Sequence, residues 1–274
     1  MTLQATDFTF VTQMVRQRSS IDLQPGKEYL VESRLAPIAR SLGDKDVAAL
    51  VVRLRRGDAQ LTDAVVDALT TNETSWFRDS HPFDAFTQHL LPDVAKSSTS
   101  RQITIWSAAC SSGQEAFSLS MLLLDWLPAH PGYSAKIFGT DISPKMVERA
   151  RAARFSQLEV NRGLRAPYLV KYFDQNGRDW VLRQQVRDLC RFDRGNLAQP
   201  AVNVPTCDIV FLRNVLIYFD LDTKRTVLTH VRRVLRPGGF LVLGGAESTL
   251  NLDDAFQRME LGRAVVFRHT GGAA

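Results

Sequence analysis

Residues 103–127 constrain the fold more than any other part of the chain. They read ITIWSAACSSGQEAFSLSMLLLDWL: a short β-branched, apolar run, then small residues ending at Gly113, then an amphipathic helix from about Glu115. This pattern predicts a strand, a tight turn and a helix. Small residues let backbone N–H groups approach a ligand closely, and the helix begins at the positive end of its dipole. We therefore expect a nucleotide-like cofactor at this turn.

A second strand and helix follow. Residues 136–141, KIFGTD, read as a short strand that ends in an acid, and the helix SPKMVERARAARF comes next. In doubly wound α/β folds an acid at this place, roughly 20 to 30 residues past the first turn, binds ribose hydroxyls. Asp141 is therefore a candidate ribose ligand. The alternative is an N-cap for the helix that starts near Ser143 and Pro144. The turn has a single glycine, so it is not the G-x-G-x-x-G fingerprint.

The core pattern resumes towards the C-terminus. Residues 208–211, DIVF, read as a buried strand, residues 222–235 as a helix stopped by Pro237-Gly238-Gly239, and residues 240–244 as the next strand. Strands that alternate with helices predict an α/β fold with a mostly parallel sheet, whose ligands bind at the carboxyl ends of the strands. Candidate site residues at such ends are Asn196, Leu197, Asn214, Val215 and Tyr218.

The N-terminal part is predicted to be helical. Residues 7–67 carry three apolar stripes at helical spacing, with Pro25-Gly26 and Gly43 between them, and show no strand-like alternation. We expect a small all-helical domain over residues 1–68. Its third helix should end near three arginines that point outward: Arg53, Arg55 and Arg56.

Residues 69–83, LTTNETSWFRDSHPF, are an unusual mixture for a plain linker. Asn72 and Thr74 offer side-chain hydrogen bonds, and the planar guanidinium of Arg78 can hold a carboxylate at two points. We expect a linker and cofactor-contacting segment over residues 69–92. The alternative is a capping segment in which Asn72 or Thr74 begins a helix and the adjacent aromatic residues are core.

Asn176-Gly177 predicts a hairpin in the second half of the chain. Two short runs flank it, residues 168–173 and 180–186, in which apolar residues partly alternate with polar ones. The position, late in the α/β unit, predicts an insertion at the edge of the sheet.

Composition sets limits on partners and compartment. The 274 residues suffice for one large domain and a smaller one, and the net charge of +5 favours an acidic partner, although solvated helix faces explain the arginine clusters equally well. Cys110, Cys190 and Cys207 lack metal-ligand spacing, so we expect plain thiols. No run reaches the roughly 18 apolar residues of a membrane span, and the N-terminus lacks a signal-peptide pattern, so a cytoplasmic protein is expected.

Four stretches resemble one family, the chemotaxis receptor methyltransferases (CheR family). They are TTNETSWFRD (70–79), IWSAACSSGQEAFSLSM (105–121), FGTDIS (138–143), and LRNVLIYFD with LRPGGFLVLGGAES (212–220 and 235–248). Generic methyltransferases of this fold have a glycine-rich first turn and lack both TTNETSWFRD and the NVLIYFD segment. The resemblance implies a Rossmann-like methyltransferase domain over residues 93–274, with an antiparallel β subdomain at about 160–192.

The resemblance also implies the chemistry and the cofactor site. Members use S-adenosyl-L-methionine, release S-adenosyl-L-homocysteine, need no metal, and methylate glutamate side chains of chemotaxis receptors. The family's cofactor site falls on Asn72, Thr74, Arg78, Glu115, Asp141, Asn196, Leu197, Asn214 and Val215. This chain departs from the usual pattern at three places. Gln114 stands where the family usually has Glu, Ala116-Phe117 where it usually has Pro-Tyr, and Trp76 where it often has Phe.

The implied partners are the cytoplasmic helices of chemotaxis receptors. Because these helices are rich in glutamate, we expect them to dock on Arg53, Arg55 and Arg56. Regulatory proteins are further candidate partners. We expect neither nucleic-acid binding nor membrane insertion, and we expect the protein to be a monomer. The edge of the hairpin is either a site for a receptor's C-terminal peptide or an edge guarded by charge, and its basic residues favour the guarded edge.

Methyl transfer to a glutamate needs no general base, because a carboxyl group with a pKa of about 4.3 is already ionised at neutral pH. Tyr218 and Arg78 are the candidates for placing the substrate carboxylate, and Tyr218 is preferred because a bare arginine would blunt the nucleophile. Two other functions stay open: a nucleic-acid methyltransferase of the same fold and a non-catalytic S-adenosylmethionine-binding regulator. The lack of an RNA-binding module argues against the first. The presence of Asn72, Arg78 and Asp141 argues against the second.

Overall fold

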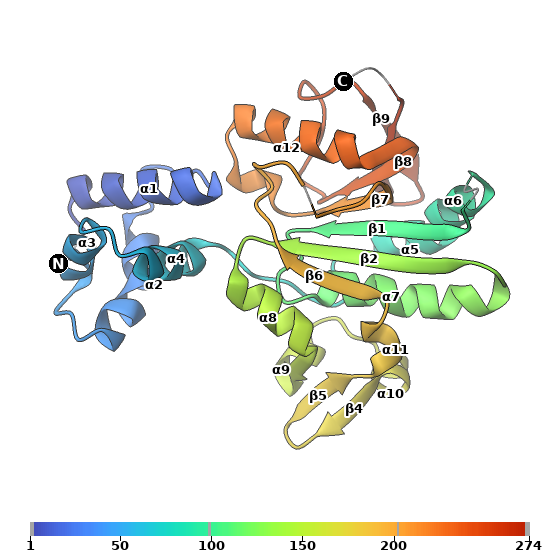
Figure 1. Ribbon diagram of the computed structural model, residues 1–274, viewed down its shortest axis with the longest axis horizontal. Helices are drawn as coiled ribbons and strands as arrows, with labels where there is room; N and C mark the ends of the chain where they lie inside the picture. Colours follow the sequence, from blue (N-terminus) through green and yellow to red (C-terminus); the bar gives the residue numbers. More distant parts are fainter. Residues whose placement is uncertain (1–2, 98–99, 202, 272–274) are drawn as a thin grey trace. The chain divides into compact units, whose positions relative to one another are not determined.

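The structure is a computed structural model that describes residues 3–97, 100–201 and 203–271. The chain divides into two compact units (Figure 1): Met1–Thr71 with Tyr218–Thr223, and Asn72–Ile217 with Lys224–Ala274. Two contacts explain why the short distant segment is part of the smaller unit. The Asp22 amide donates to the carbonyl of Tyr218 at 2.9 Å, and Arg16 pairs with Asp220.

Four helices make up most of the smaller unit: α1 Ala5–Ser19, α2 Glu28–Ser41, α3 Val47–Leu54 and α4 Ala59–Leu69. Their apolar stripes meet in a core of fully buried aliphatic side chains that includes Val15, Leu35 and Leu50. The carboxylates of Asp46 and Asp58 cap α3 and α4 by accepting backbone N–H groups at 2.9 and 3.0 Å. The predicted all-helical N-terminal domain is confirmed, and α4 is a helix beyond the three predicted stripes.

A seven-stranded sheet organises the larger unit. Its strands are β1 Gln102–Ala108, β2 Ser134–Asp141, β6 Cys190–Arg194, β7 Cys207–Leu212, β8 Leu235–Leu243, β9 Phe256–Leu261 and β10 Ala264–His269. They lie in the order β6-β2-β1-β7-β8-β10-β9 (Figure 1). The first five strands in this order are parallel, and β10 is antiparallel to both of its neighbours, β8 and β9. The predicted Rossmann-like, mostly parallel fold is confirmed. The strand order reverses beside β1, where such sheets bind ligands.

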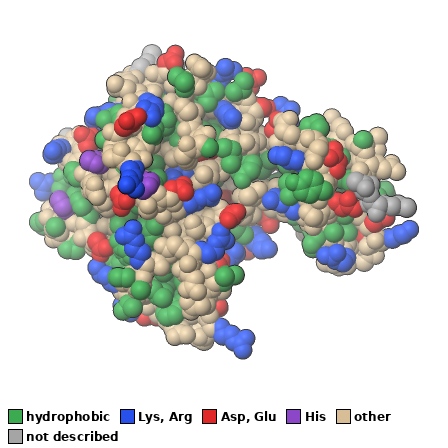
Figure 2. Space-filling view, turned by 180° about the vertical axis from the view of Figure 1, so that it is seen from behind, with side chains coloured by type: hydrophobic (Ala, Val, Ile, Leu, Met, Phe, Trp, Pro, Cys, Tyr) green, Lys and Arg blue, Asp and Glu red, His purple; other side chains and the backbone are tan. Residues whose placement is uncertain are grey.

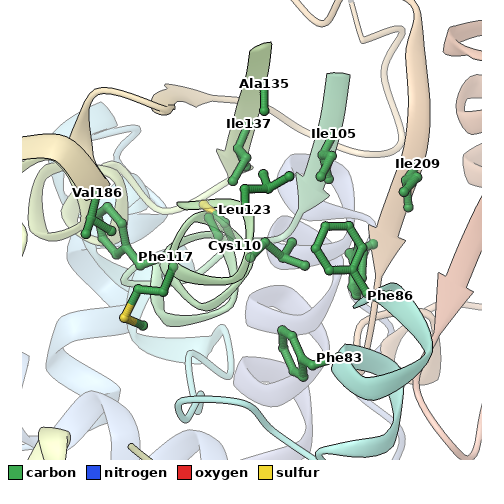
Figure 3. Close-up of a cluster of buried hydrophobic side chains, with 14 of the residues drawn as sticks. Phe83, Phe86, Ile105, Cys110, Phe117, Leu123, Ala135, Ile137, Val186 and Ile209 are labelled. Atoms are coloured by element: carbon green, nitrogen blue, oxygen red, sulfur yellow. The ribbon is translucent and has the colours of Figure 1, made fainter. Parts of the chain in front are cut away.

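Helices bury apolar side chains against this sheet. They are α5 His81–Ala85, the π-helical turn Phe86–Leu90, α6 Leu91–Ser97, α7 Gln114–Trp126, α8 Pro144–Ala152 and α12 Leu221–Val234. Figure 3 shows Phe83, Phe86 and Leu123 in one buried cluster with Ile105 and Ile209 of the central strands. The segment before β1 and the helix after it are therefore fixed to the strands that end at the switch point.

A small antiparallel sheet is inserted between α8 and β6. It consists of β3 Arg154–Ser156, β5 Asp179–Leu182 and β4 Phe173–Asn176, in that order, with short helices α9 Gln157–Val160, α10 Ala166–Tyr172 and α11 Gln184–Arg187. The predicted antiparallel subdomain is confirmed. Its strands begin at residue 154 rather than at about 160, and residues 190–192 belong to β6 of the main sheet.

The prediction of a strand over residues 168–173 is wrong, because the chain is helical as far as Tyr172. Pro167 lies in the first turn of α10, where its fixed φ suits a helix and its missing N–H costs nothing. Tyr168 and Tyr172, one helical turn apart, stack with ring centroids 6.1 Å apart. A spacing of four residues, not two, therefore brings the buried Tyr172 and the half-buried Tyr168 together. The run over 180–186 likewise leaves the strand at Leu182 and continues into α11.

The sequence has three arginine clusters: Arg53, Arg55 and Arg56, then Arg149, Arg151 and Arg154, then Arg162 and Arg165. Most of these arginines form ion pairs. The pairs are Arg53–Asp44, Arg55–Asp7, Arg149–Glu159, Arg151–Asp193, Arg154–Asp179 and Arg162–Glu73. On the face shown in Figure 2, basic and acidic side chains are interspersed. The positive charge is therefore balanced locally at these positions. Among the described residues, no helix is both long and apolar enough to cross a membrane.

Candidate functional site

The turn after β1 adopts a backbone that brings N–H groups to the edge of the sheet. Ala109 and Ser111 have φ values of 59° and 51°, and Gly113 has 94°. The Cys110 N–H donates to the carbonyl of Thr140 at 2.9 Å, which ties the turn to β2. A Cβ at Gly113 would lie 2.8 Å from the Phe117 ring, so glycine is needed both for φ and for space.

Asp141, at the end of β2, is 6% exposed. Its Oδ2 accepts the Ser111 N–H at 2.8 Å, and its Oδ1 accepts the Ser143 N–H at 2.9 Å. Ser143, not Asp141, is the N-cap of α8, because its hydroxyl accepts the Met146 N–H at 3.1 Å. The carboxylate thus holds both loops at this corner of the sheet. An ionised carboxylate has about four acceptor positions, so it can accept hydroxyl groups as well as backbone N–H groups.

Glu115, on the first turn of α7, belongs to an ionic cluster around the buried side chain of Arg213. Its carboxylate accepts the Ser107 hydroxyl at 2.8 Å and the guanidinium of Arg213 at 3.1 Å. Arg213, whose side chain is 2% exposed, also reaches the Asp79 carboxylate and the Arg78 carbonyl, both at 2.8 Å. Our sequence predictions did not include Arg213, although it lies within the LRNVLIYFD stretch. It connects the segment 72–79 to the carboxyl ends of β1 and β7.

Glu247 is a second site residue absent from our sequence predictions. Its carboxylate accepts backbone N–H groups of Asn214 at 2.7 Å, Val215 at 2.9 Å and Gly244 at 2.8 Å. Asn214 has a φ of 58°, so the loop after β7 is held in a tight turn by this acid. The available signal was an acid two residues beyond the paired glycines, Gly244-Gly245, that follow β8.

Asn196 and Leu197 lie beyond β6 and line a pocket together with Trp106 and Thr140. The Asn196 Oδ1 accepts the Ala198 N–H at 3.0 Å, and the neighbouring Gly195 N–H donates to the Asp141 carbonyl at 2.9 Å. The indole of Trp106 donates to the Thr140 hydroxyl at 2.9 Å and forms part of the wall. An apolar wall beside amide groups suits a flat heterocycle such as adenine.

The segment 72–79 is attached to the turn after β1. The Ser111 hydroxyl donates to the Asn72 carbonyl at 2.7 Å, and the guanidinium of Arg78 donates to the Glu73 carbonyl at 3.2 Å. Asn72, Thr74 and Arg78 are partly exposed. The capping alternative is half right. Neither Asn72 nor Thr74 caps a helix, because the next helix begins only at His81, but Trp76 is a core residue and Phe77 packs against the same core.

The structure brings most of the predicted cofactor residues to one edge of the sheet. Glu115, Asp141, Asn214 and Val215 follow β1, β2 and β7 at their carboxyl ends. The structure places the predicted acceptor residue Tyr218 and the three predicted docking arginines in the other, helical unit.

Burial raises the pKa of the Cys110 thiol well above its ordinary value, and the nearby charges of Asp141 and Glu115 raise it further. The thiol is therefore protonated at neutral pH and is a poor nucleophile. Within the described part of the chain, no group of three or more His, Cys, Asp or Glu side chains is placed to hold a metal ion.

Replacing Glu247 by glutamine should destabilise the larger unit. The new amide NH2 would face backbone N–H groups that now donate to the carboxylate, so we expect a loss of about 1–3 kcal/mol in the free energy of unfolding. Urea unfolding measures this loss. The matched control is Glu260→Gln on β9, where the acid pairs with Arg258 at the surface and each side chain is more than half exposed. Equal losses in both variants would show that the hydrogen bonds of Glu247 contribute no more to stability than a surface ion pair does.

Two family models together match nearly the whole chain. The model described as "CheR methyltransferase, all-alpha domain" matches residues 6–70, and "CheR methyltransferase, SAM binding domain" matches residues 72–265. The two matches meet at the boundary between the two compact units.

Curated relatives match over most of their length. "Chemotaxis protein methyltransferase 1" of Pseudomonas aeruginosa is 37% identical over 266 residues, which is 96% of this chain and 97% of that protein. "Chemotaxis protein methyltransferase" of Vibrio anguillarum is 36% identical over 272 residues, 97% of this chain and 98% of that protein. The protein of that name from Escherichia coli is 32% identical, with 91% and 86% covered. The chain therefore belongs to the CheR methyltransferase family.

Proposed function

We propose that this protein transfers a methyl group from S-adenosylmethionine to glutamate side chains of chemotaxis receptors, giving glutamate methyl esters. The observation that carries the proposal is the match of both domains to the family, with relatives of nearly the same length named chemotaxis protein methyltransferases. A catalytic domain alone would say little about the substrate. The all-helical domain in addition favours a receptor as the substrate.

The side chains at the edge of the sheet fit the proposed methyl donor. Asp141 would bind the ribose hydroxyls, and the pocket at Asn196 and Leu197 would take the adenine. Glu115 would bind the amino group of the methionine moiety, and Arg78 its carboxylate. Asn214 and Val215 complete the set through the loop that Glu247 holds.

When bound, S-adenosylmethionine supplies a methyl group activated by a positively charged sulfur. The acceptor glutamate is ionised at neutral pH, so the protein's part is to orient the reacting groups, which can lower a barrier by several kcal/mol. Tyr218 would hold the acceptor carboxylate by a hydrogen bond from its hydroxyl. Arg78 is the second candidate, and its bond to the Glu73 carbonyl uses one of five guanidinium donors.

A direct test is methyl transfer from radiolabelled S-adenosylmethionine to membranes that contain chemotaxis receptors. We expect label in the receptors, released by mild alkali because carboxyl methyl esters hydrolyse readily. Label in added RNA, or none in receptors under conditions in which the methyl donor binds, would overturn the proposal. The Tyr218→Phe variant tests the acceptor site: it should lower kcat with donor affinity unchanged.

The ribose assignment predicts that Asp141→Asn weakens binding of S-adenosylhomocysteine by roughly 10- to 150-fold, the loss typical of hydrogen bonds to a charged group. Isothermal calorimetry measures the affinity. Asp193→Asn on neighbouring β6 is the matched control, because its carboxylate pairs with Arg151 and Arg191 instead. Similar weakening in both variants would point to general charge rather than to the ribose.

The structure sharpens the test of the predicted docking surface. Arg53 and Arg55 are paired with acids, and Arg53 covers Asp44, whose side chain is 8% exposed. Reversing their charges would therefore disturb the helical unit itself. Arg56 is exposed, and among the described residues no carboxylate is within ion-pair distance of it.

We therefore predict that Arg56→Glu slows receptor methylation several-fold at low salt, because like charge then repels the glutamate-rich receptor helix. Initial rates of methyl transfer give the measurement, and affinity for S-adenosylhomocysteine should stay at the parent value. Arg40→Glu, in α2 of the same unit, is the control for net charge. Equal slowing by both variants, or by neither, would refute docking at Arg56.

A further inference from the structure

Trp76 joins the segment 72–79 to the antiparallel subdomain. Its side chain is 1% exposed, and its ring meets the rings of Phe155 and Phe173 edge to face, at centroid distances of 4.9 and 5.4 Å. Its indole N–H donates to the carbonyl of Glu159 at 3.1 Å. The segment is therefore anchored in the core of an insertion that lies far along the chain.

Backbone contacts strengthen this anchor. The Trp76 N–H donates to the carbonyl of Arg162 at 3.0 Å, and the Arg162 guanidinium pairs with Glu73 at 2.7 Å. Gly163 has a φ of +98°, and a Cβ on it would lie 2.2 Å from the Trp76 carbonyl oxygen. Only glycine allows the subdomain loop to approach so closely.

The other side of the same segment is held by the cofactor edge. The Ser111 hydroxyl donates to the Asn72 carbonyl at 2.7 Å, and the Phe77 N–H donates to the Ser118 hydroxyl at 3.1 Å. Arg213 donates to the Arg78 carbonyl at 2.8 Å. The segment thus spans from the turn after β1 to the subdomain, with Trp76 in the middle.

On the basis of the function proposed above, we propose that Trp76 is a positioning residue through which the antiparallel subdomain sets the affinity for the methyl donor. Closing the loop 159–163 on Trp76 fixes the backbone that carries Asn72, Thr74 and Arg78. Coupling between two sites is reciprocal, so donor binding must in turn stabilise the subdomain. A subdomain that only protected the sheet edge would show no such coupling.

Two variants weaken the contact in graded steps. Trp76→Phe removes the indole N–H and keeps an aromatic ring, and we expect the Kd for S-adenosylhomocysteine to rise about two- to tenfold. Gly163→Ala forces the loop away from Trp76, and we expect a rise of roughly ten- to hundredfold. The matched control is Gly177→Ala at the hairpin turn, which also has a positive φ, +65°, but whose added Cβ meets no atom within 4 Å.

The coupling can be measured by hydrogen exchange, as the extra protection that ligand binding gives to the subdomain. A simple loss of stability in a variant would not abolish this ligand-dependent protection. Peptides covering residues 72–80 and 154–182 are followed by mass spectrometry with and without S-adenosylhomocysteine. At a concentration one hundred times its Kd, the ligand should slow exchange of the parent's Trp76 amide and subdomain amides by up to about 100-fold. Gly177→Ala should keep this ligand-dependent protection, and Gly163→Ala should lose it in the subdomain.

The outcomes separate this inference from the proposed function. If the parent binds S-adenosylhomocysteine but the ligand leaves exchange in residues 154–182 unchanged, the coupling is refuted. Equal Kd values for the parent, Trp76→Phe and Gly163→Ala, measured well below their melting temperatures, would refute it too. If the parent does not bind the ligand at all, the proposed function fails and the inference fails with it.

Discussion

Two carboxylates, those of the buried Asp141 and the half-buried Glu247, fix the backbone at the carboxyl edge of the sheet, and the site depends on them. Tight turns after parallel strands leave N–H groups without a strand partner, and a buried N–H without an acceptor costs as much as a lost hydrogen bond. Asp141 accepts two such groups and Glu247 accepts several more. Charged acceptors form stronger bonds than neutral ones. An edge held in this way can orient reactants, which is the main task when no base is needed.

The sequence predicts those parts of the fold that depend on local pattern. The strand, turn and helix over residues 103–127 follow from a β-branched apolar run, small turn residues and a long apolar segment, and the all-helical N-terminal domain follows from periodicity. The strand predicted over 168–173 failed because a partly alternating run of six residues fits both periods, and Pro167 decides for the helix. Glu247 could not be found by periodicity, because its partners at Asn214 and Val215 lie some thirty residues earlier and are backbone groups.

The arginine clusters show that the sequence alone does not predict which charges are neutralised by an ion pair. Neighbouring arginines in a sequence suggest a basic surface, but Arg149, Arg151 and Arg154 each reach a different acid in three dimensions. Such exposed pairs contribute little to stability, typically below about 1 kcal/mol. Their effect is to reduce the positive potential around each cluster. Docking of an acidic partner therefore depends on which arginine has no acid within ion-pair distance. For Arg56, only the tertiary structure shows that none of the described carboxylates lies that close.

Backbone strain in the segment 72–79 and just after it supports a functional reason for its conformation. Phe77, Asp79 and Ser80 have φ values of 47°, 66° and 46°, although none is a glycine, and each such residue costs about 1 kcal/mol or more. A strained backbone persists only where its surroundings over-determine it. Here Trp76 is buried on one side of Phe77, and Arg213 holds the Arg78 carbonyl on the other. A segment that only linked two domains would relax, so the strain is consistent with a need to present Arg78 at a fixed place.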